Sequence, residues 1–473
     1  MPFDGLHEEC GVFGIYVNEK DDISPAHETH TALYALQHRG QEACGIAVNN
    51  NGVIRCHKDL GLVNTVFNQE ILDQMPGNMA IGHVRYSTTG DTSRENAQPI
   101  SITHVKGNLA VAHNGNLVNA MELRRQIELT GGIFRSSNDT EVLTYIIVRE
   151  RLQCGSIEEA VKRTMSVIQG AYSLVIMSPR KLIAARDPKG FRPLCIGKLQ
   201  NSYVFASESC ALDAMGAEFI RDVEPGELCV VENGELRSEH CGIHVPSSSC
   251  VFEYIYFARP DSVIDGASVE LARQEAGRYL AMENPVEADV VIGVPDSGIP
   301  AAIGYAKYSG IPYGVGLIKN RYIGRTFIQP GQDKRERSVR IKLNALKEAI
   351  SGKRVIMVDD SIVRGTTCAH LVKLIRDAGA KEVHMRISAP PFRHPCFFGT
   401  DIPDRELLIA HNRTVEEIRE IIGVDSLGYL SLEATHKIAI GSKRTFCDAC
   451  FSGHYSIPVP EKAEKNMFES EIK

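Results

Sequence analysis

The chain has 473 residues, 43% of them hydrophobic, and a formal net charge of −7, and its length favours two domains over a single core. The acidic balance argues against a nucleic-acid-binding surface, which needs a basic excess. No apolar run is long enough to span a membrane, and the start MPFDGLHEE lacks the basic and apolar segments of a secretory signal. We therefore expect a cytoplasmic protein that contacts neither nucleic acid nor membrane.

Strand-like runs dominate residues 10–231. They are GVFGIYV, ACGIAV, NMAIGHVRYST, LAVAHNG, AYSLVIMS and KLIAARD, with helical patterns near 25–38 and 139–169. Such strands separated by turn signals predict antiparallel sheets covered by helices, an α+β layered domain. The polar stretch ENGELRSEHCGIHVPSSS at 232–249 is predicted to connect this domain to the next.

From residue 250 to 455 the pattern changes to strands that alternate with helices. ADVVIGVPDSG precedes the helical IPAAIGYAKYSG, and KRVIMVDDSIV precedes the helical TTCAHLVKLIRDAGA. This alternation predicts a parallel sheet and therefore an α/β domain. The charged tail, 456–473, is expected to be frayed or weakly docked.

Cys10 stands at the start of the first apolar run, in EECGVFG. A cysteine in such a place is often a small packed core residue. It becomes a nucleophile with its own base if its α-amine is free, which requires removal of residues 1–9, because the Cys10 nitrogen is otherwise an amide. The stretch by itself leaves both interpretations open.

Three further segments of the first domain carry polar residues suited to a substrate. Arg85, at a predicted strand end in GHVRYSTTG, suits a fork-like grip on a carboxylate. Asn114 and Gly115, in AHNGN, either form a hairpin turn or present an amide and an N–H to an oxyanion. Asp139, in SSNDTEVL, either caps a helix or holds a substrate ammonium group.

The segment VIMVDDSIVRGTT joins a buried strand to a helix. Backbone N–H groups at a helix start, with the hydroxyls of Thr366 and Thr367, suit a phosphate, and Gly365 allows close approach. Asp359 and Asp360 suit ribose hydroxyls or a hydrated Mg²⁺. Ser297, in GVPDSG, follows another predicted strand, so it could reach the same ligand. The alternatives are that Asp359 and Asp360 form an ordinary strand-end cap and that GVPDSG is a plain turn.

Two other patterns are less specific. The basic run 319–342 is either a solvated face or a lid that closes over an anionic ligand. Cys447 and Cys450 form a C-x-x-C pair, for which a redox pair, half a zinc site and coincidence remain open. Most of the 13 cysteines are expected to be core residues, and disulfides are not expected in a reducing compartment.

In chain order, CGVFG, LQHRGQEACGIA, GHVRYSTTG, HNGN and SSNDTE resemble the glutaminase domain of class II, N-terminal-nucleophile amidotransferases. VIMVDDSIVRGTT resembles the phosphoribosyl pyrophosphate (PRPP) motif of type I phosphoribosyltransferases. With FEYIYFARPDS and RTFIQPGQ, the chain from about residue 8 to 450 resembles the amidophosphoribosyltransferase family, in its iron–sulfur branch with an N-terminal propeptide.

The resemblance implies a four-layer α+β glutaminase domain followed by an α/β phosphoribosyltransferase domain. It implies that residues 1–9 are removed, that Cys10 is the nucleophile, and that Arg85 and Asp139 hold the carboxylate and amine of glutamine. Asn114 and Gly115 would form the oxyanion hole. The implied PRPP-binding residues are Asp359, Asp360, Ser361, Arg364, Gly365, Thr366 and Thr367, and Mg²⁺ falls on Ser297, Asp359 and Asp360.

The resemblance also implies a structural [4Fe-4S] cluster on Cys250, Cys396, Cys447 and Cys450, with zinc as the alternative. The implied reaction channels ammonia from glutamine to PRPP, giving phosphoribosylamine, the first step of purine synthesis. Purine nucleotides are expected as feedback inhibitors and a homotetramer as the assembly. A sugar-phosphate acceptor and a non-catalytic PRPP-binding regulator are the rival functions; the PRPP motif argues against the first and the intact glutaminase residues against the second.

Overall fold

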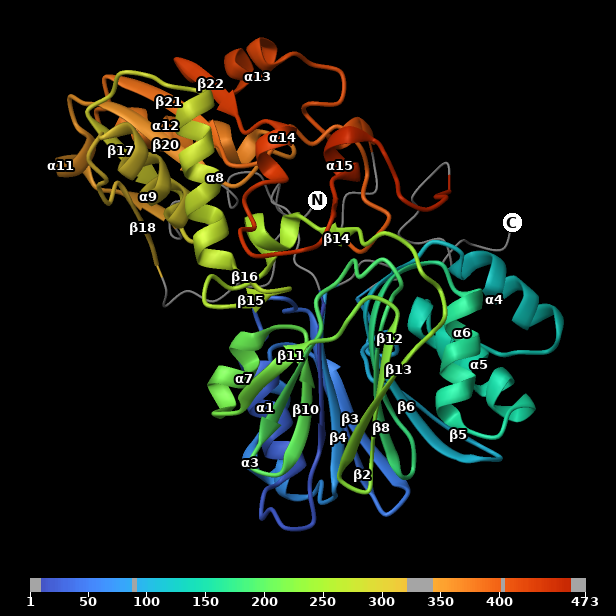
Figure 1. Ribbon diagram of the computed structural model, residues 1–473. Helices are drawn as coiled ribbons and strands as arrows, with labels where there is room; N and C mark the ends of the chain where they lie inside the picture. Colours follow the sequence, from blue (N-terminus) through green and yellow to red (C-terminus); the bar gives the residue numbers. More distant parts are fainter. Residues whose placement is uncertain (1–9, 87–91, 321–342, 401–404, 461–473) are drawn as a thin grey trace.

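Residues 10–86, 92–320, 343–400 and 405–460 are described by the computed structural model (Figure 1). The expected propeptide, nearly all of the basic run 319–342 and most of the expected tail lie outside these residues.

A seven-stranded antiparallel sheet contains the N-terminal strand β1 (Gly11–Tyr16) near its middle. Its outer face is covered by α1 (Pro25–Ala35) and α7 (Ser209–Met215), with the short α2 (Val63–Val66) and α3 (Gln69–Asp73) near one edge. In spatial order its strands are β11 (Glu218–Asp222), β9 (Cys195–Leu199), β10 (Ser202–Ala206), β1, β4 (Met79–Arg85), β2 (Ala43–Asn50) and β3 (Val53–Leu60).

A six-stranded antiparallel sheet packs against the first, with α4 (Ala120–Leu129), α5 (Asp139–Gln153) and α6 (Ile157–Val167) on its outer face. In spatial order its strands are β13 (Glu235–His240), β12 (Glu227–Glu232), β8 (Lys181–Arg186), β7 (Gly170–Met177), β6 (Gly107–Leu117) and β5 (Ile100–His104).

The helix, sheet, sheet, helix order gives the first domain four layers (Figure 1). Three hydrophobic cores separate them, and the central one interleaves residues such as Val12 and Ile81 of one sheet with Ala110 and Val175 of the other. Each strand buries one face against the opposing sheet, so hydrophobic residues tend to alternate along it, and this alternation identified the strands in the sequence. The predicted layered α+β fold is confirmed.

Two sequence expectations in this domain need correction. The helical pattern near 139–169 is two helices with a break at Cys154–Ser156. Ser156 caps the start of the second helix by accepting a hydrogen bond from the Glu159 N–H. The stretch predicted to connect the domains contains β13, which pairs with β12 along its whole length. The Asn233-Gly234 turn, where both residues have positive φ, is the hairpin signal that the sequence analysis passed over.

The second domain is built on four parallel strands in the order β17 (Val290–Gly293), β20 (Arg354–Asp359), β21 (Glu382–Ile387) and β22 (Ser426–Tyr429). The sheet's four longer helices form two packed pairs: α8 (Val269–Glu283) with α9 (Gly298–Ser309), and α12 (Thr366–Asp377) with α13 (Val415–Ile422). Apolar runs such as Val355–Val358 are fully buried, as expected for parallel strands covered on both faces.

Short elements complete the second domain, several of them close to the first. They are β14 (Ser249–Cys250), the π-helix η1 (Glu253–Phe257), β15 (Val263–Ile264), β16 (Ala267–Ser268), β18 (Leu317–Lys319), β19 (Leu343–Ala345), α11 (Lys347–Ile350), the 3-10 helix η2 (Arg405–Leu407), α14 (Leu432–Thr435), β23 (Phe446–Cys447) and α15 (Ala449–Ser452).

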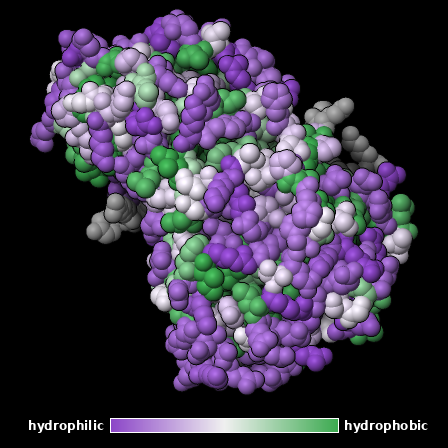
Figure 2. Space-filling model, viewed as in Figure 1, coloured by the Kyte–Doolittle hydropathy of each residue, from purple (hydrophilic) through white to green (hydrophobic). Residues whose placement is uncertain are grey.

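On the face shown in Figure 2, hydrophobic residues occur in small groups between hydrophilic ones. Among the described helices, none is long and apolar enough to cross a membrane.

Candidate active sites and cysteine cavity

Cys10 lies directly before β1 and is 5% exposed. Its thiol donates a hydrogen bond to the Tyr86 carbonyl at 3.4 Å, and its own carbonyl accepts one from Arg39 Nε at 2.9 Å. Because β1 and β4 are antiparallel with Gly11 opposite Val84, the same register brings Cys10 level with Arg85. The backbone of the buried Arg85 therefore lies beside that of the predicted nucleophile, on the neighbouring strand.

Asn114 and Gly115 lie within β6, which continues to Leu117, so the hairpin-turn alternative is wrong. Asn114 is fully buried, and in the described part of the chain neither its Oδ1 nor its Nδ2 has a hydrogen-bond partner. Gly115 has φ +142°, and a Cβ there would lie 2.0 Å from the Ala171 carbonyl oxygen. A buried amide without a partner costs free energy, which a ligand atom bound at this position would offset.

Asp139 is buried as the first residue of α5, but the helix cap is Asn138, whose side chain accepts the Thr140 N–H at 2.9 Å. Asp139 Oδ2 instead accepts the Leu117 N–H at 3.0 Å, and Oδ1 lies 3.5 Å from His113 Nδ1. Burial raises the pKa of Asp139, but His113 and these hydrogen bonds together lower it by more than burial raises it. The pKa of Asp139 is therefore below its usual value. Asp139 therefore stays ionised beside the end of β6.

His83 links the two sheets beside these residues, and the sequence analysis did not identify it. Its Nε2 lies 3.0 Å from the carbonyl oxygen of His113, the residue before Asn114. Full burial lowers the pKa of His83 to about 3, so the ring is neutral and Nε2–H donates to that carbonyl. His83 thereby holds β4 and β6 together two residues from Arg85 and next to Asn114.

The second candidate site lies at the carboxyl ends of β17 and β20. Asp360 follows β20 and accepts hydrogen bonds from the hydroxyls of Ser297 and Ser361, so the structure brings Ser297 to the predicted carboxylates. Burial, together with the charge of Asp360, raises the pKa of Asp359 well above its usual value, and burial also raises that of Asp360. Two adjacent carboxylates, Asp360 buried and Asp359 half-buried, favour a bound cation.

The loop after these carboxylates turns at Gly365 and leads directly into a helix. Gly365 has φ +84°, and a Cβ there would lie 2.5 Å from Ile409 Cδ1. α12 begins at the next residue, so its first N–H groups and the Thr366 and Thr367 hydroxyls lie at a positive helix end. At the start of the basic run, Lys319 forms an ion pair with Asp296 at 2.6 Å; residues 321–342, to which the predicted lid belongs, lie outside the described residues.

The four cysteines of the expected cluster line one small cavity of about 20 Å³, together with Phe392, Phe398 and Tyr455. β14 pairs with β23 so that Cys250 is opposite Cys447. Burial and the neighbouring thiols raise the pKa values of Cys250 and Cys450 well above the usual value. Metal binding would stabilise the thiolates and remove this penalty.

As placed, no three His, Cys, Asp or Glu side chains within the described ranges are grouped closely enough for a single metal ion. A zinc ion needs its sulfur ligands at about 2.3 Å. A [4Fe-4S] cluster instead binds one thiolate per iron, so its ligands surround a larger body. The four thiols line one cavity, which is the arrangement that either kind of site would need.

The chain matches two protein families, one in each domain. Residues 83–214 match the glutamine amidotransferase domain family, and residues 270–393 match the phosphoribosyl transferase domain family. These matches cover β4 to α7 of the first domain and α8 to β21 of the second.

Relatives and solved structures align along nearly the whole chain. The amidophosphoribosyltransferase of Archaeoglobus fulgidus is 51% identical over 453 residues, 95% of this chain and 98% of that protein. The Bacillus subtilis protein of that name is 50% identical over 457 residues, 95% of this chain and 94% of the relative.

Two solved structures are similar in fold throughout. One, described as the allosteric regulatory enzyme of purine biosynthesis, has a TM-score of 0.91 and 47% identity and covers 98% of this chain and 99% of its own. The other, the glutamine PRPP amidotransferase of B. subtilis complexed with ADP and GMP, has a TM-score of 0.90 and 48% identity and covers 97% and 100%. The chain therefore belongs to the amidophosphoribosyltransferase family.

Proposed function

We propose that this protein hydrolyses glutamine and transfers the released ammonia to C1 of PRPP, giving 5-phosphoribosylamine, glutamate and pyrophosphate. This is the first step of de novo purine biosynthesis. The observation that carries the proposal is the presence, on one chain aligned end to end with amidophosphoribosyltransferases, of a glutaminase-type site and a PRPP-type site.

In the glutaminase half, removal of residues 1–9 frees the α-amine of Cys10. This amine takes the thiol proton while sulfur attacks the glutamine carboxamide carbon. Asn114 Nδ2 and the Gly115 N–H stabilise the oxyanion, which fits the unsatisfied amide of Asn114. Collapse to a thioester releases ammonia, with the proton returned by the amine, and water then releases glutamate.

Substrate orientation in this half falls to two charged side chains. Arg85 binds the α-carboxylate of glutamine, and Asp139 binds its α-ammonium group. The support is that Arg85 lies level with Cys10 across β1 and β4, and that Asp139 remains ionised beside β6. Both groups are buried, so each charge is worth more than it would be in water.

In the phosphoribosyltransferase half, the loop from Ser361 through Arg364 to Thr367 binds the 5-phosphate of PRPP at the start of α12. Asp359 and Asp360 bind the ribose hydroxyls and, with Ser297, one Mg²⁺. Bound Mg²⁺ would neutralise the pyrophosphate leaving group.

The four cavity cysteines bind one [4Fe-4S] cluster per subunit with a structural role, because neither half reaction transfers electrons. Purine nucleotides act as feedback inhibitors, since a nucleoside monophosphate shares the ribose 5-phosphate that the 361–367 loop recognises. That a related structure holds ADP and GMP is consistent with this. The enzyme works as a homotetramer in the cytoplasm.

The deciding experiment compares Cys10→Ala with wild type, using glutamine and ammonium separately as nitrogen donors. We expect glutamine-dependent synthesis to be lost and ammonia-dependent synthesis to remain. Intact mass should show that active wild-type protein starts at Cys10. A variant still active with glutamine, or active enzyme that retains residues 1–9, contradicts the proposed mechanism; failure to form phosphoribosylamine from ammonia and PRPP contradicts the proposed acceptor.

A further inference from the structure

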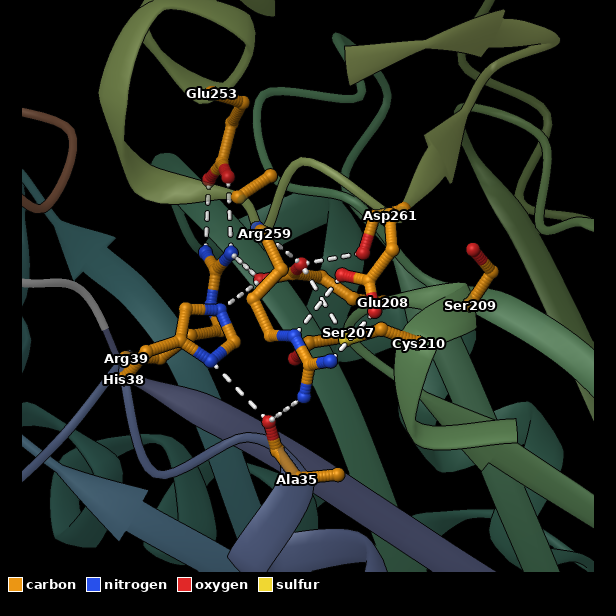
Figure 3. Close-up of polar contacts among 12 residues, drawn as sticks. Ala35, His38, Arg39, Ser207, Glu208, Ser209, Cys210, Glu253, Arg259 and Asp261 are labelled. Carbon is orange, nitrogen blue, oxygen red and sulfur yellow. Dashed lines mark hydrogen bonds and ion pairs between the residues drawn. The ribbon is translucent and has the colours of Figure 1, made fainter. Parts of the chain in front are cut away.

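Arg39 follows α1 and is completely buried at the junction of the two domains. Its Nε donates to the Cys10 carbonyl at 2.9 Å. Nη1 donates to Glu208 at 2.6 Å and to Glu253 at 2.9 Å, and Nη2 donates to Glu253 at 2.8 Å (Figure 3). One planar guanidinium thus joins the candidate nucleophile to two carboxylates, an arrangement that lysine cannot reproduce.

The two carboxylates come from different domains. Glu208 precedes α7 of the first domain, whereas Glu253 opens η1 of the second. Glu208 also accepts the Arg259 N–H at 2.9 Å and the Ser262 hydroxyl at 2.7 Å, so the 253–262 segment contacts it twice more. The contact between Arg39 and Cys10 therefore belongs to an interdomain network, and both carboxylates are removed from solvent.

The position of Glu253 is set within the second domain. Arg273, on α8, donates to the carbonyls of Tyr254 at 2.9 Å, Tyr256 at 2.8 Å and Ala258 at 2.7 Å. These bonds hold η1 and the residue after it against α8. The Glu253 carboxylate therefore reaches Arg39 only when the second domain is folded and docked against the first.

The hydrogen bond to the Cys10 carbonyl can fix the conformation of Cys10. A residue that begins the mature chain has no preceding peptide bond to fix it. The direction of its carbonyl fixes its ψ angle, and this angle sets where the α-amine and thiol lie relative to β1. Proton transfer between thiol and amine depends on that geometry.

We propose that Arg39 is a positioning residue for Cys10, held in place by Glu253 of the second domain, so that the glutaminase nucleophile is aligned only in the docked two-domain enzyme. The inference rests on the proposed role of Cys10. Arg39 neither contacts glutamine nor transfers a proton in this scheme. Its effect should appear in the turnover and reactivity of Cys10 and be weak in glutamine affinity, which depends on Arg85 and Asp139.

The test uses Arg39→Lys in the full-length enzyme. We expect kcat for glutamine hydrolysis to fall about 10²-fold, the size of effect that a small misplacement of a reacting group produces. KM for glutamine should stay near the wild-type value, and alkylation of Cys10 by iodoacetamide should slow in parallel with kcat. Ammonia-dependent synthesis should persist. Glu253→Gln should give the same pattern with a smaller loss.

Arg186→Lys is the matched control. Arg186 is also a buried first-domain arginine that pairs with a second-domain carboxylate, Asp265, through two contacts of 2.9 Å. Its other hydrogen bonds go to the carbonyls of Gly190, Arg192 and Val223, away from Cys10. We expect this variant to lose thermal stability but to keep the kcat for glutamine hydrolysis and the alkylation rate of Cys10.

Equal losses of kcat in Arg39→Lys and Arg186→Lys would overturn the inference, because they would show a general effect of a loosened interface. Normal kcat in Arg39→Lys would overturn it directly. If Arg39→Lys does not fold by circular dichroism, Glu253→Gln decides, since it leaves Arg39 paired with Glu208. A glutamine-active Cys10→Ala enzyme would instead overturn the proposed function, whatever Arg39 does.

Discussion

The two candidate sites differ in how the chain builds them. The phosphoribosyltransferase site comes mostly from one contiguous stretch, because a parallel strand delivers its carboxyl end and the next helix start to the same place. The glutaminase site is assembled from the start of β1, the end of β4, the middle of β6 and the start of α5, which are separated by up to 129 residues, from Cys10 to Asp139. A local motif therefore suffices to recognise the first, whereas the second depends on how two sheets stack.

This difference predicts that each half can be disabled separately. The largest effect is expected for Asn114→Ala, which removes one oxyanion donor and should lower the kcat for glutamine hydrolysis by about 10²–10³-fold. Ammonia-dependent synthesis should be unaffected. Asn108→Ala, at the other end of β6, is the control, because Asn108 contacts the Gly52 carbonyl in a surface turn. Equal losses of kcat in both variants would show that the substitutions act by disturbing β6 and not by removing an oxyanion donor.

Asp360→Asn tests the other half. It keeps the size of the side chain but removes the charge, so synthesis should fall by about 10²-fold with either nitrogen donor, given the several kcal/mol that a bound cation supplies. Glutamine hydrolysis measured without PRPP should remain. The measurement is pyrophosphate release as a function of Mg²⁺ concentration, and an unchanged Mg²⁺ dependence would remove Asp360 from the proposed cation site.

The cysteine cavity is not part of either site, so losing the proposed cluster should affect stability before chemistry. Cys447→Ser should abolish absorbance near 400 nm and lower the unfolding midpoint by roughly 5–10 °C, since each kcal/mol shifts Tm by about 2–4 °C at this domain size. Cys241→Ser, in the first domain and outside the cavity, is the control. A colourless, iron-free wild-type enzyme of normal stability would contradict the cluster.

The smallest expected effect concerns the joint between the two sheets. Burial lowers the pKa of His83 from 6.5 to about 3, so only the unfolded chain binds this proton as pH falls below 6.5. Folding stability attributable to His83 is therefore complete above pH 6.5 and declines by up to about 1.4 kcal/mol per pH unit between pH 6.5 and 3.

His83→Gln keeps a donor for the His113 carbonyl but does not titrate. The free energy of unfolding, measured by urea denaturation at pH 7.5 and 5.5, should therefore fall less in this variant than in wild type. Identical pH dependence in the two proteins would show that His83 is already protonated, or solvated, in the folded state.

Sequence patterns predicted the fold correctly where hydrophobic period and local chemistry agree. Alternating strands in the first domain and buried apolar runs in the second indicated the right layers, and the motifs indicated the family that the comparisons show. They left alternatives open where local signals compete. The Asn-Gly pairs at 51–52 and 233–234 form turns with positive φ at both residues, whereas the pair at 114–115 lies in a strand.

What separates the alternatives is tertiary structure. Nothing in the residues beside Asn114 separates it from Asn51 or Asn233; pairing of β6 with β7 keeps the strand extended through the dipeptide. Likewise, Arg39 and Glu253 both occur in motifs that the sequence analysis quoted, but charged residues are predicted at the surface unless their partners are known. Their pairing across 214 residues becomes visible only in the folded chain.

By itself, the sequence determined the two-domain plan, the family, the strand-end position of Asp359 and Asp360, and the choice of Cys10 as the candidate nucleophile. Each of these follows from local period, spacing or motif. Only the tertiary structure decided that Cys10 lies level with Arg85, that the Asn114 amide is buried without a partner, and that four distant cysteines share one cavity. These features depend on register and on packing between layers, which no local pattern specifies.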